Sequence, residues 1–157
     1  FRPEHFNGVA SVVLRLLIIT KPEVLFLGEK DWQQYIIIRQ LIKDLDLPIK
    51  LRGIGTVRDK DGMAFSSRNE RLSQEEKINA LEMNRQLSQA EQNVKKGDII
   101  NSDYIKSQLT KTGLEVDYVE NVDPYTLQIV KGSKRLSLLA AAIRCGKTRL
   151  IDHRFLF

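Results

Sequence analysis

Two short apolar runs, separated by a helical stripe, constrain the fold of this chain more than any other feature. Residues 24–28, VLFLG, form a continuous apolar run that ends in glycine, and residues 49–57, IKLRGIGTV, form a second run. From residue 30 or 31 to about residue 44, apolar side chains recur at helical spacing. This order predicts two parallel strands joined by a crossover helix. The first strand, being continuously apolar, is expected to be buried on both faces.

A further amphipathic helix is predicted ahead of the first strand. Its apolar residues recur at i, i+3, i+4, i+7 and i+8, and Pro22 ends it. Residues 1–57 therefore predict part of a Rossmann-type domain, an α/β fold with a parallel sheet. The apolar positions are Val9, Val12, Val13, Leu16 and Leu17 in the first helix and Tyr35, Ile38, Leu41, Ile42 and Leu45 in the second.

From residue 58 the pattern changes and predicts a second, smaller α+β domain over residues 58–157. Residues 58–70, RDKDGMAFSSRNE, are polar and aperiodic, which predicts a loop long enough to carry function. Ser73 and Glu76 have the spacing of a capping box, which predicts a helix that ends near Gly97. The apolar face of that helix is Ile78, Leu81, Leu87, Ala90 and Val94, and a shorter helix holds Tyr104, Ile105 and Leu109.

The remaining residues predict an antiparallel meander. One of its turns contains Gly146, Lys147 and Thr148, which imitate the end of a phosphate-binding P-loop. The glycine that a P-loop needs upstream would fall on Ala141, so we interpret this segment as a hairpin turn. The strand-like runs are residues 114–122, 127–130, 135–144 and 149–156, and the turns between them are residues 123–126, 131–134 and 145–148.

Composition limits the class of protein and its partners. With 42% hydrophobic and 29% charged residues, the chain has the composition of a folded globular protein. A net charge of +5 favours anionic partners such as nucleotides, carboxylates or nucleic acid, although a merely basic surface gives the same value. The apolar stretch of the first helix is interrupted by Arg15 and is too short to span a bilayer, so no membrane partner is expected. The single cysteine, Cys145, fits a cytoplasmic protein.

The residues after the first predicted strand form a candidate phosphate site. In an open parallel sheet, ligands bind at the carboxyl ends of strands, where the amides of the next helix are unpaired. Gly28, Glu29, Lys30 and Asp31 occupy that place. Lys30 would add a mobile positive charge suited to a triphosphate, and Asp31 would accept hydrogen bonds from ribose hydroxyls. The alternative is an ordinary solvated helix start.

The end of the long loop supplies a second candidate phosphate site. Ser66, Ser67 and Arg68 offer two hydroxyls and a guanidinium, and arginine binds phosphate oxygens in a fork. A solvated loop can contain the same residues. Because each candidate site follows a strand of the same predicted sheet, we expect Lys30 and Arg68 to lie along one edge and to bind a single nucleotide.

Together these segments resemble the pantothenate synthetase family, the pantoate–β-alanine ligases. The resemblance is carried by FRPEHFNGVASVV, FLGEKDWQQ, IRQLIKDLDLPI, GIGTVRDKDGMAFSSRN and AAAIRCGKTRLIDH, in order and over nearly all 157 residues. It implies ATP-dependent condensation of pantoate with β-alanine through a pantoyl adenylate, with release of AMP and pyrophosphate and with Mg²⁺ on the phosphates. It also implies a core like that of the class I adenylyltransferases and, for the full-length protein, a homodimer.

The resemblance also implies roles for the matching residues. Lys30 would bind phosphates, Asp31 would bind the ribose, and Gln34 would hydrogen-bond pantoate. No side-chain nucleophile is needed, and no metal ligand of the protein is predicted. The other residues that would line the ATP site or close over it are Gly28, Glu29, Val57 through its main chain, Phe65, Ser66, Ser67 and Arg68; the catalytic set is Lys30, Ser66, Ser67 and Arg68.

The chain departs from the family pattern in two ways. Glu4 stands where the family has glycine, which affects the local backbone. The family's His-x-Gly-His motif and its pantoate-binding glutamine precede the matched stretch and do not occur here. We therefore expect this chain to be the C-terminal half of such an enzyme and to be inactive by itself. His5 and His153 are assigned no catalytic role.

Two other functions are compatible with the sequence. One is a nucleotidylyltransferase of the same superfamily. The other is a non-catalytic, basic nucleic-acid-binding module, which the net charge permits. The aromatic residues do not interleave with the basic ones and no nucleic-acid-binding motif occurs, so we expect no nucleic-acid partner.

Overall fold

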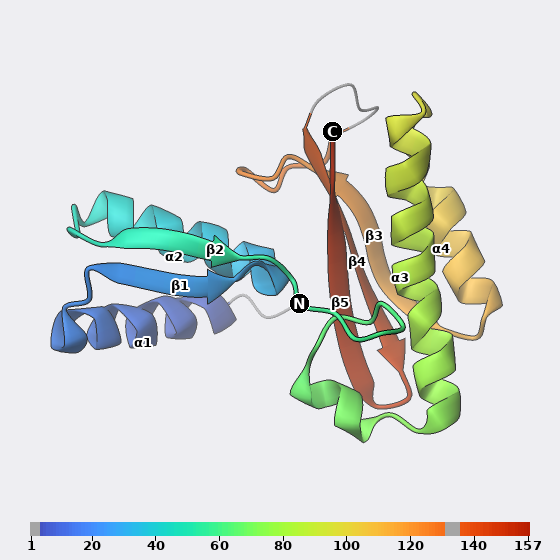
Figure 1. Ribbon diagram of the computed structural model, residues 1–157, viewed down its shortest axis with the longest axis horizontal. Helices are drawn as coiled ribbons and strands as arrows, with labels where there is room; N and C mark the ends of the chain where they lie inside the picture. The colour runs from blue at the N-terminus through green and yellow to red at the C-terminus, as the bar shows by residue number, and fades with distance from the viewer. Residues whose placement is uncertain (1–3, 131–135) are drawn as a thin grey trace. The chain divides into compact units, whose positions relative to one another are not determined.

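The chain is described by a computed structural model that covers residues 4–130 and 136–157. It divides into two compact units, Phe1–Thr56 and Val57–Phe157, each with its own sheet and hydrophobic core (Figure 1). Within the part of the chain that is described, no helix is long and apolar enough to cross a membrane. The predicted turn at residues 131–134 lies outside the described residues.

The first unit is a helix followed by a strand–helix–strand crossover. Its two strands are parallel, with Val24 opposite Lys50 and Gly28 opposite Ile54. A parallel pair needs a long crossover connection, which the second helix supplies, so the predicted α/β arrangement is confirmed. The elements are α1 (His5–Thr20), β1 (Val24–Gly28), a 3₁₀ turn (Glu29–Asp31), α2 (Trp32–Asp44) and β2 (Lys50–Ile54).

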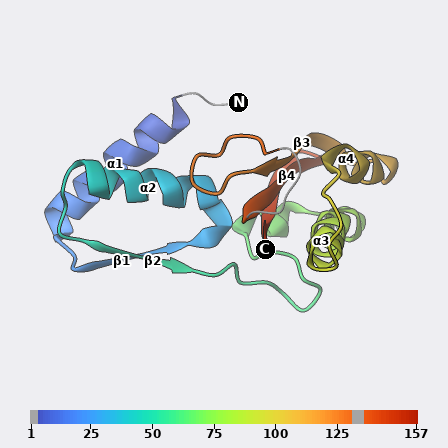
Figure 2. The same ribbon diagram turned by 90° about the horizontal axis from the view of Figure 1, so that it is seen from above.

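Both helices of the first unit pack on the same face of the strand pair (Figure 2). On the opposite face, Phe26 is 62% exposed. The expectation that this strand is buried on both faces is therefore wrong, because α1 and α2 cover the same side and no element among the described residues 4–56 covers the other. The core consists of Leu17, Ile38 and Ile42, with Val9, Val13, Leu25, Leu27, Leu41, Leu47, Ile49 and Leu51 packed against it.

Only part of each predicted apolar stripe is buried. In α1 the row at Val9, Val13 and Leu17 joins the core, whereas Val12 and Leu16 are exposed. The core-facing row repeats every four residues, and one row suffices to cover a sheet of two strands. Leu45, predicted to face inward, is also exposed, since α2 ends at the preceding residue.

The second unit is a three-stranded antiparallel sheet with two helices on one face (Figures 1 and 2). The strand order β3-β4-β5 confirms the predicted antiparallel α+β part. Leu139 and Ile143 of β4, Leu87 of α3 and Leu109 of α4 are fully buried in one core. The elements are a 3₁₀ turn (Ser67–Arg71), α3 (Gln74–Lys95), α4 (Ser102–Lys111), β3 (Glu115–Val122), β4 (Ser137–Cys145) and β5 (Thr148–Leu156).

The capping box at the start of α3 is formed as predicted. The Ser73 hydroxyl accepts a hydrogen bond from the Glu76 amide at 3.1 Å, and the Glu76 carboxylate accepts one from the Ser73 amide at 2.8 Å. The predicted apolar face is wrong at Ile78, which is 68% exposed. Ile78 lies two residues from the buried Ala80, which places it roughly 200° around the helix and away from the sheet.

Residues 127–130 do not form the strand that was predicted. They contribute a single bridge, between Val122 and Ile129. Leu127 has a φ of 58°, which breaks the extended backbone that a strand requires. The Asp123 carboxylate accepts hydrogen bonds from the amides of Tyr125 and Thr126, so the chain turns here instead of extending.

The three-stranded sheet of the second unit contains a carboxylate that lies between two guanidinium groups. Asp117 of β3 accepts hydrogen bonds from Nε of Arg149 at 2.6 Å and from Nε of Arg144 at 3.0 Å. The hydrogen bond from Arg149, aided by Arg144, holds the pKa of the Asp117 carboxyl below its ordinary value of 3.8. The ion pairs therefore stabilise the folded unit as long as this carboxyl is ionised.

We expect Asp117→Asn to lower the free energy of unfolding by about 1–2 kcal/mol at neutral pH, through the loss of two charge-assisted hydrogen bonds. The folded-state pKa lies below the unfolded one, so this stabilisation is complete above the unfolded value and is lost as the pH falls through the folded value. The difference between wild type and variant should shrink below about pH 4. Urea unfolding at neutral and acidic pH measures it, and an equal difference at both would contradict the assignment.

Candidate functional site

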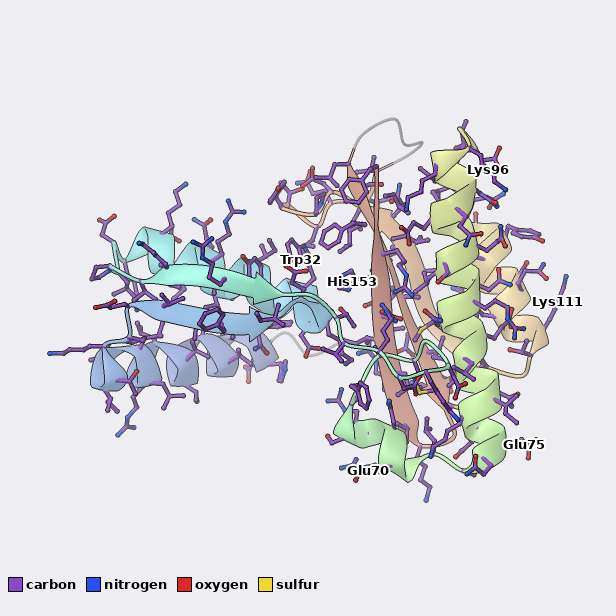
Figure 3. The ribbon with its side chains drawn as sticks, viewed as in Figure 1. Trp32, Glu70, Glu75, Lys96, Lys111 and His153 are labelled. Carbon is purple, nitrogen blue, oxygen red and sulfur yellow. The ribbon has the colours of Figure 1, made fainter. Side chains whose placement is uncertain are left out.

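The first predicted phosphate site is the turn between β1 and α2. Gly28 ends β1, the 3₁₀ turn Glu29–Asp31 follows, and α2 begins at Trp32, which Figure 3 labels. Asp31, the N-cap residue of α2, makes no side-chain capping hydrogen bond. Helix amides that lack a side-chain cap are available to donate to an anion, and the helix dipole adds positive potential there.

Lys30 is the positive charge of this turn. Its side chain is half-buried, and the structure records no hydrogen bond or ion pair between its ammonium and any described residue. Gln34 lies one turn further along, on α2, and is also half-buried. Trp32 and Tyr35 stack with their ring centroids 4.9 Å apart, which stiffens the first turn of the helix. The turn thus holds an uncompensated cation on a rigid support.

Gly53 of β2 makes room for the carboxylate of Glu29. A Cβ atom built at Gly53 would clash with Oε1 of Glu29, so the carboxylate lies directly against the backbone of the neighbouring strand. Gly53 was not among the residues predicted to lie in this region. A glycine inside a strand pattern signals a close approach by another group, and that signal is present in the sequence.

The second predicted site begins with a tight hairpin, not an irregular loop. The Phe65 amide donates to the Val57 carbonyl at 2.9 Å, and Arg58 and Ala64 form an antiparallel bridge. Between them the Asp59 carboxylate accepts hydrogen bonds from two backbone amides, and Gly62 adopts a φ of 90° that favours glycine. The predicted loop at residues 58–70 is therefore ordered by its own hydrogen bonds.

The Ser-Ser-Arg residues form the turn that follows this hairpin. The Ser66 hydroxyl accepts a hydrogen bond from the Arg68 amide at 3.2 Å and caps the 3₁₀ turn. Asn69 donates from its side chain to the Ala64 carbonyl at 2.9 Å, which joins the turn to the hairpin. Ser67 and Arg68 are exposed, and no described residue hydrogen-bonds or ion-pairs with the Arg68 guanidinium. The backbone of the turn is held by hydrogen bonds, whereas the side chains of Ser67 and Arg68 are left exposed.

The residues of each candidate site lie within one unit. Gly28, Glu29, Lys30, Asp31 and Gln34 lie in the first unit, at the end of β1 and the start of α2. Val57, Phe65, Ser66, Ser67 and Arg68 lie in the second unit, on the hairpin and its turn.

Other reactive side chains do not form a competing site. Cys145 is buried, its thiol donates to the Glu76 carbonyl at 3.2 Å, and burial raises its pKa, which disfavours the nucleophilic thiolate. His153 is buried on β5, with its ring against that of Phe155 (Figure 3). Gly146 lies in the hairpin turn between β4 and β5, as predicted, and not in a P-loop. Across residues 4–130 and 136–157, no group of three or more His, Cys, Asp or Glu side chains could hold a metal ion.

The order of these motifs is matched by one family of known proteins. The sequence model of pantoate–β-alanine ligase matches residues 1–155. This chain belongs to the pantoate–β-alanine ligase family. The resemblance noted from the sequence motifs is therefore confirmed.

The curated relatives include bifunctional pantoate ligase/cytidylate kinases. The chain is 52% identical over 155 residues to a bifunctional pantoate ligase/cytidylate kinase of Parasynechococcus marenigrum (strain WH8102), covering 99% of this chain and 30% of the relative. It is 49% identical to the protein of the same name from Prochlorococcus marinus (strain MIT 9313), covering 31% of that relative. The chain thus spans about a third of the length of these pantoate ligase relatives.

Solved pantoate–β-alanine ligases have the same fold. Pantothenate synthetase from Thermus thermophilus matches with a TM-score of 0.88 at 33% identity, over 98% of this chain and 56% of that one. A pantoate–β-alanine ligase from Francisella tularensis, in complex with beta-gamma ATP and β-alanine, matches with a TM-score of 0.77 at 33% identity, over 98% of this chain and 51% of that one.

A substitution at Gly53 tests the close packing of the Glu29 carboxylate against β2. We expect Gly53→Ala to displace the Glu29 carboxylate and to lower the free energy of unfolding by about 1 kcal/mol, the low end for overpacking because the displaced group is flexible. Gly55→Ala is the matched control, since no heavy atom lies within 4 Å of a Cβ placed there. Denaturant unfolding of both variants measures the difference, and equal stabilities would contradict the packing described.

Proposed function

We propose that this chain is part of an enzyme that condenses pantoate with β-alanine at the expense of ATP, through a pantoyl adenylate, with release of AMP and pyrophosphate. Family membership over residues 1–155 supports the proposal. The observation that carries it is the Ser-Ser-Arg turn, whose backbone is held by hydrogen bonds while the guanidinium of Arg68 is bound to no described residue. A site of this kind is preorganised for an anion.

The proposed reaction has two steps. The carboxylate of pantoate attacks the α-phosphorus of ATP, the bond to the β-phosphate breaks, and pyrophosphate leaves. The amine of β-alanine then attacks the acyl carbon, and AMP leaves with the pair of electrons of the acyl–oxygen bond. Negative charge grows on phosphate oxygens in the first step, so fixed cations and hydrogen-bond donors lower its barrier.

We assign the residues to these steps as follows. Lys30 and Arg68 bind the phosphates, Asp31 accepts hydrogen bonds from the ribose, and Gln34 binds pantoate. Residues 1–57 would belong to the nucleotide-binding domain, and residues 58–157 would be the smaller domain that carries the ATP loop. The other proposed ATP-site residues are Gly28, Glu29, the main chain of Val57, Phe65, Ser66 and Ser67.

The remaining partners belong to the same proposal. Mg²⁺ would be bound through the phosphates of ATP, as the family resemblance implies. A homodimer for the full-length protein is inferred from the family resemblance. A cytoplasmic location rests on Cys145 as the sole, unpaired cysteine. Nucleic acid and membrane are not among the proposed partners.

Pantoate-dependent exchange of pyrophosphate into ATP by the full-length protein tests the function. The proposed ligase exchanges pyrophosphate only when pantoate is present, and it forms pantothenate once β-alanine is added. A nucleotidylyltransferase would exchange with another co-substrate and not with pantoate. RNA or DNA binding that depends strongly on salt, and that is unaffected by changes at Lys30 or Arg68, would support the nucleic-acid-binding alternative instead.

Lys30 provides the sharpest residue-level prediction for this function. We expect Lys30→Ala in the full-length protein to lower the rate of pantoate-dependent exchange by about 100-fold or more, because a preorganised cation on the phosphates is lost. The fold should be retained, since the Lys30 ammonium makes no hydrogen bond or ion pair with a described residue. Lys43→Ala is the matched control, an exposed lysine in the last turn of α2. Equal exchange rates for the two variants would show that Lys30 does not bind the phosphates.

A further inference from the structure

Arg58 stands at the base of the hairpin that precedes the Ser-Ser-Arg turn. Its backbone bridges to Ala64, two residues before Ser66. Its guanidinium also donates to the Gly62 carbonyl at 3.1 Å, which ties the tip of the hairpin to its base. A shift of this one side chain would therefore be transmitted to both strands of the hairpin.

The same guanidinium holds a carboxylate that is far away in the sequence. Nη1 of Arg58 donates to Oδ2 of Asp152 at 2.7 Å, and Nη2 donates to Oδ1 at 2.8 Å, across 94 residues of chain. This two-pronged geometry fixes the orientation of the guanidinium as well as its distance. The Asp152 side chain is only 2% exposed, so its charge depends on partners within the protein.

The Asp152 carboxylate has two further contacts on its own strand. It accepts a hydrogen bond from the His153 amide at 2.8 Å and longer ones from Nη1 of Arg154 at 3.4 and 3.5 Å. Arg154 is also engaged elsewhere. It donates to Asn84 and to Ser88 of α3 and lies 3.7 Å from Glu91. Arg154 therefore links β5 to α3, and Arg58 is left as the bidentate partner of Asp152.

We propose that the ion pair of Arg58 with Asp152 positions the Ser-Ser-Arg turn, and that Arg58 is a positioning residue for ATP, an inference that rests on the proposed function. The pair anchors the hairpin to β5. The hairpin in turn sets the place of the next residues through the bond from the Phe65 amide to the Val57 carbonyl and the bond from Asn69 to Ala64. The exposed hydroxyls and the Arg68 guanidinium are carried by this anchored backbone, although Arg58 touches none of them.

The same sheet contains a matched control for this ion pair. Asp117 also lies between two guanidinium groups, with 6% of its side chain exposed, and it pairs with Arg149 of β5. This pair joins β3 to β5 and involves no residue of the hairpin. Loss of either carboxylate charge removes a shielded ion pair from one sheet, but only Asp152 is connected to the turn.

The first experiment follows the turn without requiring activity. Hydrogen exchange is measured by NMR in the full-length protein for the amides of Phe65 and Asn69, which are hydrogen-bonded in the structure. We expect Arg58→Lys and Asp152→Asn each to accelerate their exchange by about tenfold, because the hairpin opens locally. Arg149→Lys and Asp117→Asn should leave both amides unchanged. Lysine keeps the charge but not the two-pronged geometry, so Arg58→Lys leaves Asp152 compensated and the unit folded.

The second experiment asks whether the anchor matters for ATP. We expect Arg58→Lys to raise the KM for ATP in pantoate-dependent exchange by about tenfold while the KM for pantoate stays within about twofold, since misplacement affects only what the turn binds. In an Arg68→Ala background the same change should have little further effect, because both act through one group. The controls Arg149→Lys and Asp117→Asn should leave both KM values as in the wild type.

The outcomes separate the two proposals. A wild-type protein without pantoate-dependent exchange overturns the proposed function, whereas the hydrogen-exchange result still decides whether Arg58 anchors the turn. If the Phe65 and Asn69 amides exchange alike in Arg58→Lys and Arg149→Lys, the anchor is refuted. Equal effects on the KM for ATP and for pantoate, or full additivity with Arg68→Ala, refute its role in positioning.

Discussion

The buried carboxylate of Asp152 must be neutralised for the second unit to be stable. Asp152 is 2% exposed, and an uncompensated charge at such a depth costs about 3–5 kcal/mol when one partner is removed. Arg58 and Arg154 supply the compensation from two directions. Arg58 belongs to the hairpin and Arg154 to β5, and both guanidinium groups donate to Asn84 of α3. The charge of Asp152 therefore adds a link between the hairpin, α3 and β5 to the hydrophobic core that packs α3 on the sheet.

Several arginines of the second unit and the two proposed phosphate-binding cations differ in their partners. Arg58, Arg144, Arg149 and Arg154 all have carboxylate partners within the second unit. Burial lowers the pKa of the Arg154 guanidinium, and its carboxylate partners oppose that shift. Lys30 and Arg68, the two proposed phosphate ligands, have no partner among the residues described. Cations left unpaired on ordered turns keep their full attraction for an incoming anion, which is what a nucleotide site requires.

Local sequence patterns predicted which helices and strands form better than they predicted which faces of those elements are buried. The capping box at Ser73 and the crossover helix were predictable because the interactions that form them lie within a few residues. The burial of Phe26 was predicted wrongly, because an apolar strand does not specify which of its faces a helix will cover. The segment at residues 127–130 has strand-like composition, yet Leu127 adopts a positive φ that composition does not reveal.

For the candidate site, the sequence identified the chemical groups but not what holds them. Ser66, Ser67 and Arg68 were recognisable from residue type and motif, and the residues before them were predicted to form a polar loop without periodicity. The hairpin that orders it depends partly on Gly62 and Asp59, which are local, and partly on Arg58 and its distant carboxylate. A contact across 94 residues leaves no periodic trace in the sequence.

By itself, the sequence determined the family and the order of most helices and strands, because each of these is specified by neighbouring residues or by motif spacing. The phosphate-binding residues remain a prediction from the same motifs. The tertiary structure alone decided which face of β1 is covered, which arginines are neutralised, and which backbone holds the Ser-Ser-Arg turn. Those outcomes depend on burial and charge pairing between residues far apart in the chain. Such interactions exist only once the chain has folded.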